Sequence, residues 1–398
     1  MSEDILIIGA GLSGLHVALQ LSKNPKYRIT IAEKYNYIGG RVVTYHSKIP
    51  ANTHWENGAG RIAMSHTLVR NYVKHYGLTM IPIDSDQVWR TEGKEYPDSW
   101  PAISTLIDSS LSSLSPAALA THTIQELLEI VGDPSILLTF PYRSEITTLR
   151  ADLALDAFKK EMNPHTKFFI VAEGLDTLIK GMKKELDSRG VKFLMKHSLQ
   201  GIEGTTCTFE GGKILSADKL ILAIHSKALK QIPSFTGNKI LKHLEMTPLL
   251  RIYAVFPTDG KSWFSHLKKT VTDSPIRYII PINSKKGIIM ISYTDGEDTQ
   301  KWLHHLEKGE DVLQREIMKE LRKLFPMTIP DPIFFKAHPW KDGCTYWLPG
   351  LYSPAELSKK IMNPFPDVYV CGESYSMKQA WMEGALEHAD EMLNKFLL

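Results

Sequence analysis

Short apolar runs alternate with segments of helical periodicity in the first part of the chain. Residues 5–8 (ILII) are a continuous, mostly β-branched run, residues 15–23 carry apolar positions at helical spacing, and residues 28–34 contain a second apolar run. A strand, a tight turn, a helix and another strand in this order are typical of two buried parallel strands joined by a crossover helix. The sequence therefore predicts a β-α-β unit near the amino terminus.

The middle of the chain changes from helical to strand-like periodicity. Residues 68–76 and most of residues 103–160 have a helical pattern, which SSLSSLSP and GDP interrupt, and this predicts an inserted helical region. A strand, a turn and a helix are expected over residues 168–186. Strand-like runs joined by glycine-containing turns follow at residues 191–204, 207–215 and 218–224.

The last third of the chain predicts a second sheet. Three runs have the pattern of antiparallel strands, at residues 249–256, 277–282 and 287–293. The elements expected after them are a helix over 299–324, a strand and turn over 367–374 and an amphipathic helix over 379–398. We therefore expect an α/β fold, α+β overall, with more than one domain.

Composition and charge limit the class of protein. Of 398 residues, 43% are hydrophobic and 23% are charged, with 26 glycines and 22 prolines, which is typical of a folded globular protein. The net charge is +3 and no long basic run occurs, so we expect a small-molecule partner and neither nucleic acid nor a membrane surface. Every apolar run is shorter than the roughly 20 residues that a membrane-spanning helix needs.

Cysteine content indicates the compartment. Cys207, Cys344 and Cys371 are too few and too scattered for a disulfide framework or a cysteine-rich zinc site, which favours a reducing environment. The amino terminus leads directly into a strand and offers no targeting segment. The expectation is a cytoplasmic protein without a metal site.

Gly9, Gly11 and Gly14 form a G-x-G-x-x-G motif between the first predicted strand and helix. In dinucleotide-binding folds one glycine makes the turn, the next lets the backbone approach a pyrophosphate, and the third permits close helix packing. Glu33 ends the second strand, where a carboxylate can accept hydrogen bonds from both ribose hydroxyls. The alternative interpretation is a glycine-rich turn that only packs a helix.

A second glycine pair follows the acidic strand end. Gly39 and Gly40 would admit an extended cofactor, and the guanidinium of Arg41 could pair with its diphosphate. This pattern favours FAD over NAD. The alternative is an ordinary loop with a solvated arginine.

With these motifs in place, the sequence resembles the flavin-containing amine oxidoreductases, which include monoamine oxidases, polyamine oxidases and L-amino acid oxidases. The resemblance spans most of the chain and rests on IIGAGLSG, AEKYNYIGGRV, ENGAGRI, VAEGLDTLIKGM, SADKLILAI, DVYVCGES and WMEGALEHA. It implies a Rossmann-like FAD-binding domain of the amine oxidase type, interleaved with a mixed-sheet substrate domain that carries a helical insertion.

The resemblance also implies domain boundaries and cofactor contacts. The FAD-binding domain would comprise residues 1–66, 165–235 and 363–398, and the substrate domain residues 67–164, with the helical insertion, and 236–362. The residues placed at FAD would be Gly9, Gly11, Leu12, Ser13, Gly14, Glu33, Lys34, Gly40, Arg41, Gly58, Ala59, Gly60, Arg61, Leu199, Cys344, Gly372, Glu373, Trp381 and Met382.

Some of these positions have a specific role in the family. Gly372 and Glu373 would lie near the flavin ribityl chain and diphosphate, and Leu199 would contact adenine through its backbone. The helix opening at Met382 would direct its first N–H groups at the flavin pyrimidine ring, where the reduced cofactor is negative.

Two arginines are candidate substrate residues. ENGAGRI is most similar to the L-amino acid oxidase branch, in which the arginine matching Arg61 holds the substrate carboxylate. Pairing of Arg61 with the FAD diphosphate or with an internal acid is the alternative. Arg251 stands where the family has a lysine near the flavin, and arginine cannot serve as a tunable base. It would anchor an anionic substrate or cap the sheet.

Aromatic residues would line the substrate face. Trp381 matches one wall, and Tyr346, or else Trp347, would supply the other, although each could instead belong to the core. Cys344 follows a glycine, as does the cysteine that carries covalent flavin in monoamine oxidases. We expect non-covalent FAD, with a thioether through Cys344 as the alternative to a buried thiol. His225 is expected to be a turn residue.

The resulting hypothesis is an FAD-dependent amine oxidoreductase. It would oxidise a C–N bond by hydride transfer to flavin, yielding an imine, and O2 would reoxidise the flavin to give hydrogen peroxide. Arg61 favours an L-amino acid over a monoamine or polyamine. The alternatives are a desaturase-type flavoenzyme and a catalytically silent FAD-binding partner protein; the oligomeric state is left open.

Overall fold

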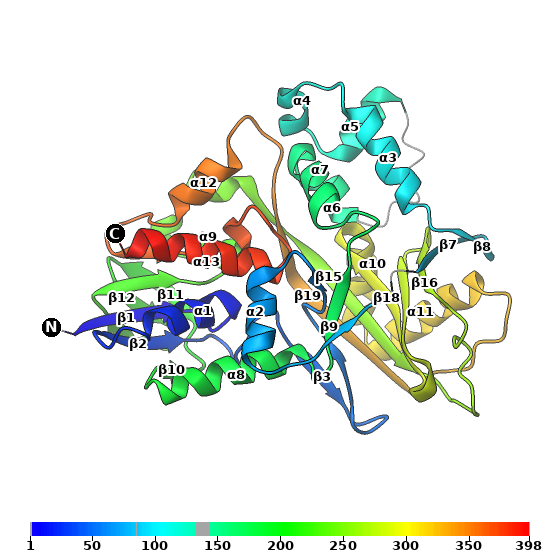
Figure 1. The fold of residues 1–398 in the computed structure, drawn as a ribbon, viewed down its shortest axis with the longest axis horizontal. Coiled ribbons are helices and arrows are strands. Elements are labelled where there is room, and N and C mark those ends of the chain that lie inside the picture. Colours follow the sequence, from blue (N-terminus) through cyan, green and yellow to red (C-terminus); the bar gives the residue numbers. More distant parts are fainter. Residues whose placement is uncertain (1, 85, 133–142, 398) are drawn as a thin grey trace.

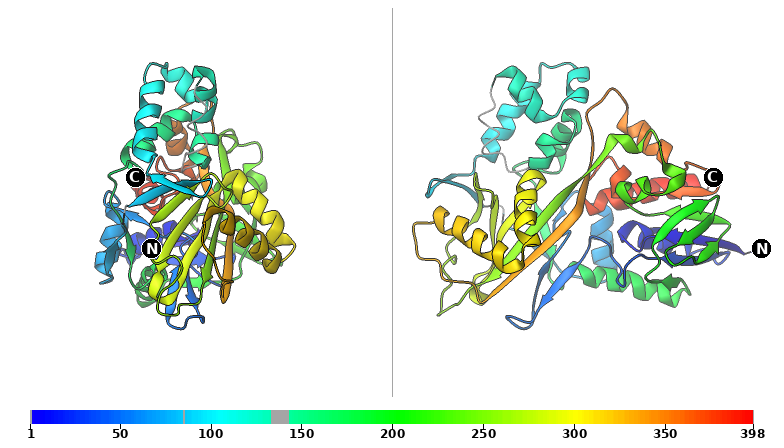
Figure 2. Two further views of the ribbon diagram at one scale, coloured as in Figure 1. Left: turned by 90° about the vertical axis from the view of Figure 1, so that its right-hand side faces the viewer. Right: turned by 180° about the vertical axis from the view of Figure 1, so that it is seen from behind.

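The computed structural model describes residues 2–84, 86–132 and 143–397. Two sheets lie side by side, each with helices packed on it, and a further group of helices stands at one end of the molecule (Figures 1 and 2). Both chain ends lie on the side of the parallel sheet (Figure 1). The expected α/β fold with parallel and mixed sheets is therefore confirmed.

The first sheet is five-stranded and parallel. In spatial order its strands are β10 (Lys192–Leu194), β2 (Tyr27–Ala32), β1 (Glu3–Ile8), β14 (Lys219–Leu222) and β20 (Val368–Val370). Ile5 and Ile7 of β1 face one hydrophobic cluster, and Leu6 and Ile8 face another. Both faces of the sheet are buried, which explains why β1 is a continuous apolar run.

Different layers cover the two faces of this sheet. One face carries α1 (Leu12–Leu21), α8 (Leu175–Ser188) and α13 (Met382–Phe396). The other face packs against an antiparallel sheet of β11 (Leu199–Glu203), β12 (Thr206–Phe209) and β13 (Ile214–Ser216). The predicted β-α-β unit is confirmed, and segments from the start, middle and end of the chain meet in one sheet.

The second sheet is mixed, because β16 and β7 pair in parallel and its other described pairs are antiparallel. In spatial order its strands are β19 (Phe334–Trp347), β15 (Leu244–Val255), β18 (Ile288–Asp295), β17 (Tyr278–Asn283), β16 (Lys269–Thr272), β7 (Gln87–Thr91) and β8 (Lys94–Pro97). Apolar pattern does not predict β19, because Pro339, Asp342 and Gly343 interrupt it.

Two helices cover the second sheet, α10 (Gly296–Glu307) and α11 (Glu310–Leu324). The expectation of a single helix over 299–324 is wrong. The chain turns at Lys308 and Gly309, and Gly309 has a φ of 133°, which glycine adopts with little strain. Trp302 before the turn and Leu313 after it pack in the same cluster, so the helical spacing of apolar residues continues across the break.

The helical insertion is present. Its helices are α3 (Trp100–Leu111), α4 (Pro116–Thr121), α5 (Ile124–Val131), α6 (Arg143–Thr147) and α7 (Ala151–Lys160). Thr123 and Glu126 form a capping box at the start of α5, and Gly132 ends this helix in the left-handed conformation. Gly132 is also the first residue of the GDP interruption, whose Asp133 and Pro134 lie outside the described residues.

The remaining elements connect the two sheets. They are β3 (Thr44–Ser47), β4 (Thr53–Glu56), β5 (Ile62–Ala63), α2 (Thr67–His75), β6 (Met80–Pro82), β9 (Phe168–Val171), α9 (Ser226–Lys230) and α12 (Pro354–Ile361). The carboxylate of Glu383 in α13 accepts hydrogen bonds from the backbone N–H groups of Leu68 and Val69, at 2.8 and 2.9 Å. It therefore caps α2 and fixes it against α13.

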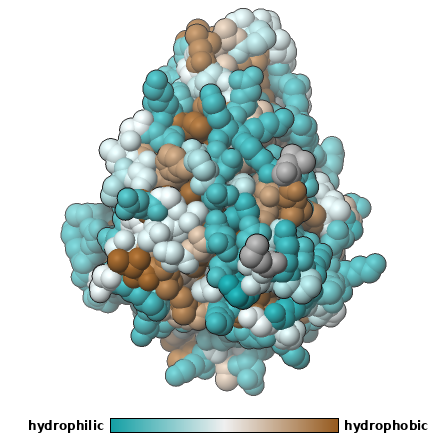
Figure 3. Space-filling view, turned by 90° about the vertical axis from the view of Figure 1, so that its left-hand side faces the viewer, coloured by the Kyte–Doolittle hydropathy of each residue, from teal (hydrophilic) through white to brown (hydrophobic). Residues whose placement is uncertain are grey.

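The face around the chain termini is mainly hydrophilic, with separate groups of hydrophobic residues between the polar ones (Figure 3). In the described parts of the chain, no helix has both the length and the apolar character needed to cross a membrane.

Candidate active site

A cavity of about 880 Å³ lies between the parallel sheet, the start of α13 and the strands β15, β18 and β19. It begins where β1, β2 and β14 end, and the carboxyl ends of parallel strands are the usual place for a nucleotide in such sheets. Every residue that the sequence assigns to the cofactor or the substrate lines this cavity, except Gly14 and Trp347, the alternative to Tyr346. The structure therefore brings together residues from all parts of the chain.

The three glycines of the first turn have different surroundings. A Cβ atom on Gly14 would lie 2.0 Å from the carbonyl oxygen of Gly9, so Gly14 permits the close contact between α1 and β1. A Cβ atom on Gly11 would meet no atom within 4 Å, because this residue borders the open cavity. Gly40 packs against Gly11, and its ideal Cβ position lies 3.2 Å from the Gly11 Cα.

Glu33 lies just beyond β2 and is buried at the cavity wall. Its carboxylate accepts hydrogen bonds from the backbone N–H groups of Ala10 and Tyr35, at 2.7 and 2.8 Å. These bonds hold the carboxylate at the end of the glycine turn, and each oxygen keeps a lone pair for a further hydrogen bond. Tyr35 and Tyr37, which the sequence analysis did not select, stack with ring centres 5.2 Å apart at the mouth.

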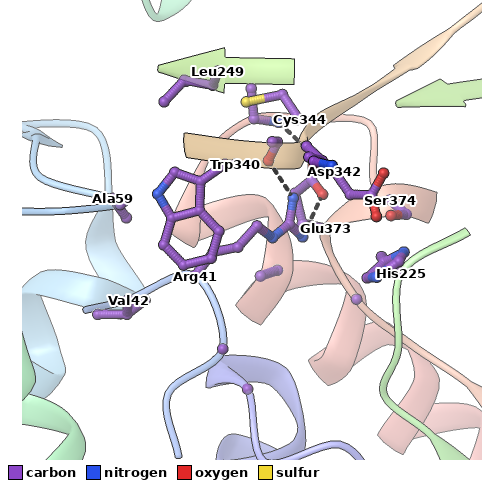
Figure 4. A pocket seen from close by; sticks show the side chains of 18 of the residues that line it. Arg41, Val42, Ala59, His225, Leu249, Trp340, Asp342, Cys344, Glu373 and Ser374 are labelled. Atoms are coloured by element: carbon purple, nitrogen blue, oxygen red, sulfur yellow. Dashed lines mark hydrogen bonds and ion pairs between the residues drawn. The ribbon is translucent and has the colours of Figure 1, made fainter. Parts of the chain in front are cut away.

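Arg41 lines the cavity and also makes contacts within the protein. Its Nη1 donates to the carbonyl of Gly343 at 2.7 Å, and its Nη2 donates to Glu373 at 2.8 Å (Figure 4). Burial alone would lower the pKa of Arg41, but the neighbouring carboxylate of Glu373 raises it, so the pair stays ionised. Arg41 thus joins the first glycine-rich region to β19 and to the last segment of the chain, and its contact with an FAD diphosphate stays a prediction.

Glu373 also organises the turn that leads to α13. Its carboxylate accepts from the backbone N–H groups of Thr345 and Ala380, at 3.2 and 2.8 Å. Helix α13 then begins at Met382 with no side-chain cap, and Trp381, Met382 and Ala385 all line the cavity. Uncapped N–H groups at a helix start favour a negative ligand group.

These features fit an FAD molecule. The space beside Gly11 admits a pyrophosphate, Glu33 offers a ribose acceptor, and the start of α13 suits the anionic edge of a reduced flavin.

Cys344, Trp340 and His225 stand around the Arg41–Glu373 pair (Figure 4). Loss of hydration raises the pKa of the Cys344 thiol well above its usual range, so it is a neutral thiol at pH 7. Trp340 donates from Nε1 to the carbonyl of Asn57 at 2.9 Å. His225 accepts a 3.2 Å hydrogen bond from the Ala228 N–H and caps α9, in agreement with the expected turn role.

Arg61 reaches the cavity beside two aromatic rings. Its guanidinium carbon lies 5.0 Å from the centre of the Phe168 ring and 5.6 Å from that of Trp381. These distances are typical of cation–π contacts. In the described parts of the chain Arg61 forms no ion pair with a carboxylate. Pairing with an internal acid, one of the alternatives from the sequence, is therefore not observed there.

Arg251 is held inside the second sheet. Its Nη1 donates to the carbonyl of Glu56 at 3.1 Å, and its guanidinium carbon lies 5.1 Å from the centre of the Tyr293 ring. Burial opposes its charge, but Tyr253, Tyr293 and Glu56 outweigh that effect and raise the pKa of Arg251. It stays protonated at all ordinary pH values.

The aromatic candidates take different positions. Trp381 stacks on Phe168 with ring centres 5.8 Å apart and planes 10° apart, and His66 meets it edge-on. Tyr346 is buried, lines the cavity and donates from its hydroxyl to Glu145 at 3.3 Å. Trp347, the second choice from the sequence, is fully buried in the core and does not line the cavity.

Two acidic residues in the substrate end of the cavity were missed. Glu145 comes from the short helix α6, and Asp295 ends β18 at the start of α10. Loss of hydration raises the pKa of Glu145 to about 8 and that of Asp295 to about 6. Neither belongs to a recognisable motif, so only the fold could reveal that they meet.

Comparisons with known proteins decide the family. The sequence profile of the flavin containing amine oxidoreductases matches residues 12–139 and 138–391. The chain belongs to this family. The putative L-amino-acid oxidase YobN of Bacillus subtilis is 43% identical to it, with 97% of this chain and 92% of the relative covered. An L-amino-acid oxidase of Siganus canaliculatus is 24% identical, with 98% and 84% covered.

The fold of this amine oxidoreductase is similar to that of a putrescine oxidase variant with redesigned cofactor binding. The TM-score is 0.76 at 13% sequence identity, and 100% of this chain and 99% of the other are covered. The expected fold of the FAD-dependent amine oxidases is thus confirmed. The protein is a flavin-dependent amine oxidoreductase with a flavin cofactor.

Proposed function

We propose that the protein is an L-amino acid oxidase that contains FAD and uses O2 as its electron acceptor. The observation that carries this proposal is Arg61, a cation at the cavity without a carboxylate partner in the described parts of the chain, beside Trp381. A guanidinium in this position suits a substrate carboxylate, which it can hold through two hydrogen bonds. The relatives named as L-amino-acid oxidases support the same assignment.

Each residue at the substrate end would have a distinct task. Arg61 binds the α-carboxylate, and Trp381 and Tyr346 provide aromatic surface for the rest of the substrate. FAD, when bound, accepts a hydride from the carbon that bears the amine, so the products are an imine and, after reoxidation by O2, hydrogen peroxide. Arg251 stays charged, so it takes no part as a base.

We further propose that FAD is bound without a covalent link. Attack on a flavin methyl group requires a thiolate, and burial keeps Cys344 in its neutral form. Flavin should then leave the protein when the holoenzyme is precipitated with acid, and yellow pellets would contradict this.

We also place the protein in the cytoplasm, because Cys207, Cys344 and Cys371 are all unpaired thiols.

Anaerobic mixing tests the substrate assignment. L-amino acids should bleach the oxidised flavin absorbance, whereas monoamines and polyamines should not. Arg61→Ala should slow bleaching by about 100-fold or more, which is the loss expected when two charge-assisted hydrogen bonds to the carboxylate are removed. Arg61→Lys is the matched control, because it keeps the charge and loses the planar fork, and it should recover part of the rate.

Two outcomes would overturn the proposal. Bleaching by amines that lack a carboxylate, at a rate that Arg61→Ala leaves unchanged, would favour a monoamine or polyamine oxidase. Flavin that never bleaches with any amine would favour a desaturase-type enzyme or a silent FAD-binding protein.

A further inference from the structure

The substrate end of the cavity carries an acidic pair in addition to Arg61. Glu145 and Asp295 come from separate elements, α6 and the junction of β18 with α10, and both line the same cavity as Trp381 and Arg61. The two acids are also neighbours, because the backbone N–H of Ser144 donates to Asp295 at 3.3 Å. They are therefore presented together at one place in the cavity wall.

The hydrogen bonds of Glu145 leave one oxygen unused. The Tyr346 hydroxyl donates to its Oε1 at 3.3 Å, which holds the carboxyl group in place. Its Oε2 is buried and has no hydrogen-bond partner among the residues that the structure describes, and the residue is only 9% exposed. A buried polar atom without a partner costs free energy, and a ligand that supplies a hydrogen-bond donor recovers it.

Positive groups near the pair do not fully neutralise it. Arg61 faces Glu145 at long range, and Arg277 and Arg143 face Asp295. Arg277 also pairs with Asp298, with 3.7 Å between its Nε and the carboxylate oxygen. Its Nη1 donates to the carbonyl of Thr272 at 2.9 Å. Despite these arginines, loss of hydration raises the pKa of both acids, and a further cation beside them would oppose that effect.

We propose that Glu145 and Asp295 bind a positively charged side chain of the substrate, which makes the protein selective for basic L-amino acids. This inference rests on the proposed function, because Arg61 must hold the carboxylate at the other end. A basic L-amino acid can satisfy both ends of this site. Its carboxylate would pair with Arg61, and its charged side chain would donate a hydrogen bond to Glu145. A neutral side chain would leave Oε2 of Glu145 unpaired.

L-arginine and L-citrulline test the pair directly, because they have nearly the same shape and differ in the charge at the end of the side chain. In anaerobic stopped-flow reduction of the holoenzyme, the apparent second-order rate constant should be about 10- to 100-fold higher for L-arginine, the range for a buried hydrogen bond between charged groups. Equal rate constants for the two substrates in the wild type would overturn the inference.

Glu145→Gln keeps an acceptor for Tyr346 but cannot become negative, so the preference for L-arginine should fall to within about 3-fold. Asp295→Asn keeps the acceptor for Ser144 and should reduce the preference as well, which covers the case in which the first variant fails to fold. Glu307→Gln lies at the exposed far end of α10 and should leave the preference unchanged. A preference that survives both Glu145→Gln and Asp295→Asn would contradict the proposal.

Binding gives a readout that does not depend on turnover. L-arginine should raise the melting temperature of the flavin-free protein more than L-citrulline does, and Glu145→Gln should remove the difference. Rapid reduction by L-citrulline would overturn this inference and leave the L-amino acid oxidase assignment intact. Reduction of the flavin by agmatine, and by neither amino acid, would overturn the L-amino acid oxidase assignment. If Glu145→Gln then abolished reduction by agmatine, the binding of a cationic side chain by the acidic pair would still be supported.

Discussion

At the residue scale, Gly11 and Gly14 have different roles. Gly11 borders the space for the cofactor, whereas Gly14 packs against the backbone of Gly9. A methyl group on Gly14 would collide with the carbonyl of Gly9 at 2.0 Å, whereas one on Gly11 would extend into the cavity. Gly14→Ala should therefore lower the stability of the flavin-free protein by about 2 kcal/mol or more, as expected for overpacking. Gly11→Ala should leave its melting temperature unchanged and weaken FAD binding by at least about 10-fold. Normal FAD affinity in Gly11→Ala would contradict the cofactor assignment.

The second prediction at this scale concerns how Glu145 makes the stability of the protein depend on pH. Its pKa of about 8 in the folded protein lies above the usual value for glutamate, so the folded state binds the extra proton between these values. Stability from this group is present at low pH and is lost as the pH rises toward 8. The stability of Glu145→Gln relative to the substrate-free wild type should therefore increase between pH 6 and 8, by about 1 kcal/mol or more. Chemical denaturation at several pH values measures it, and a flat difference would show that Glu145 is already ionised at pH 6.

At the element scale, the helical insertion reaches the aromatic wall through a hydrogen bond between Glu161 and His66. Glu161, just after α7, accepts from the fully buried ring of His66 at 3.1 Å, and this contact lowers the pKa of Glu161 to about 2. The His66 ring in turn meets Trp381, with centres 4.9 Å apart. Trp381 is thus held between Phe168 of β9 and His66 at the start of α2.

Glu161→Ala should therefore loosen Trp381 and lower kcat/KM by about 10-fold, mainly through KM, with FAD content unchanged. Glu161→Gln retains an acceptor for His66 and should stay within about 3-fold of the wild type. Steady-state peroxide formation with measured flavin content provides both values. A Glu161→Ala variant with unchanged KM would show that the pair serves stability alone.

Some helices and strands could be predicted from sequence patterns, and others could not. The β-α-β unit, Glu33 and the start of α13 are local features, in which turn chemistry and periodicity coincide, and they could be predicted. The helix break at Gly309 could not, because apolar spacing continues across it. Strand β19 was missed because residues that usually end strands interrupt it, yet eleven of its residues pair with β15, on the two sides of a register shift.

At the scale of the whole molecule, the substrate end of the site depends on contacts between distant segments. Arg41 pairs with Glu373 from the last part of the chain, a contact that no motif predicts. Glu145 and Asp295 lie in segments without any motif, and they meet only because α6 packs at the junction of β18 and α10. The motifs therefore predict the cofactor end of the cavity, whereas the tertiary fold determines the substrate end.

Arg61 is expected to select substrates that carry a carboxylate. L-arginine and agmatine differ only in that carboxylate, so their anaerobic reduction of the wild-type holoenzyme is the most direct measurement. We expect rapid bleaching of the flavin by L-arginine, a rate at least about 100-fold lower with agmatine, and loss of this difference in Arg61→Ala. Equal bleaching by the two compounds in the wild type would contradict it.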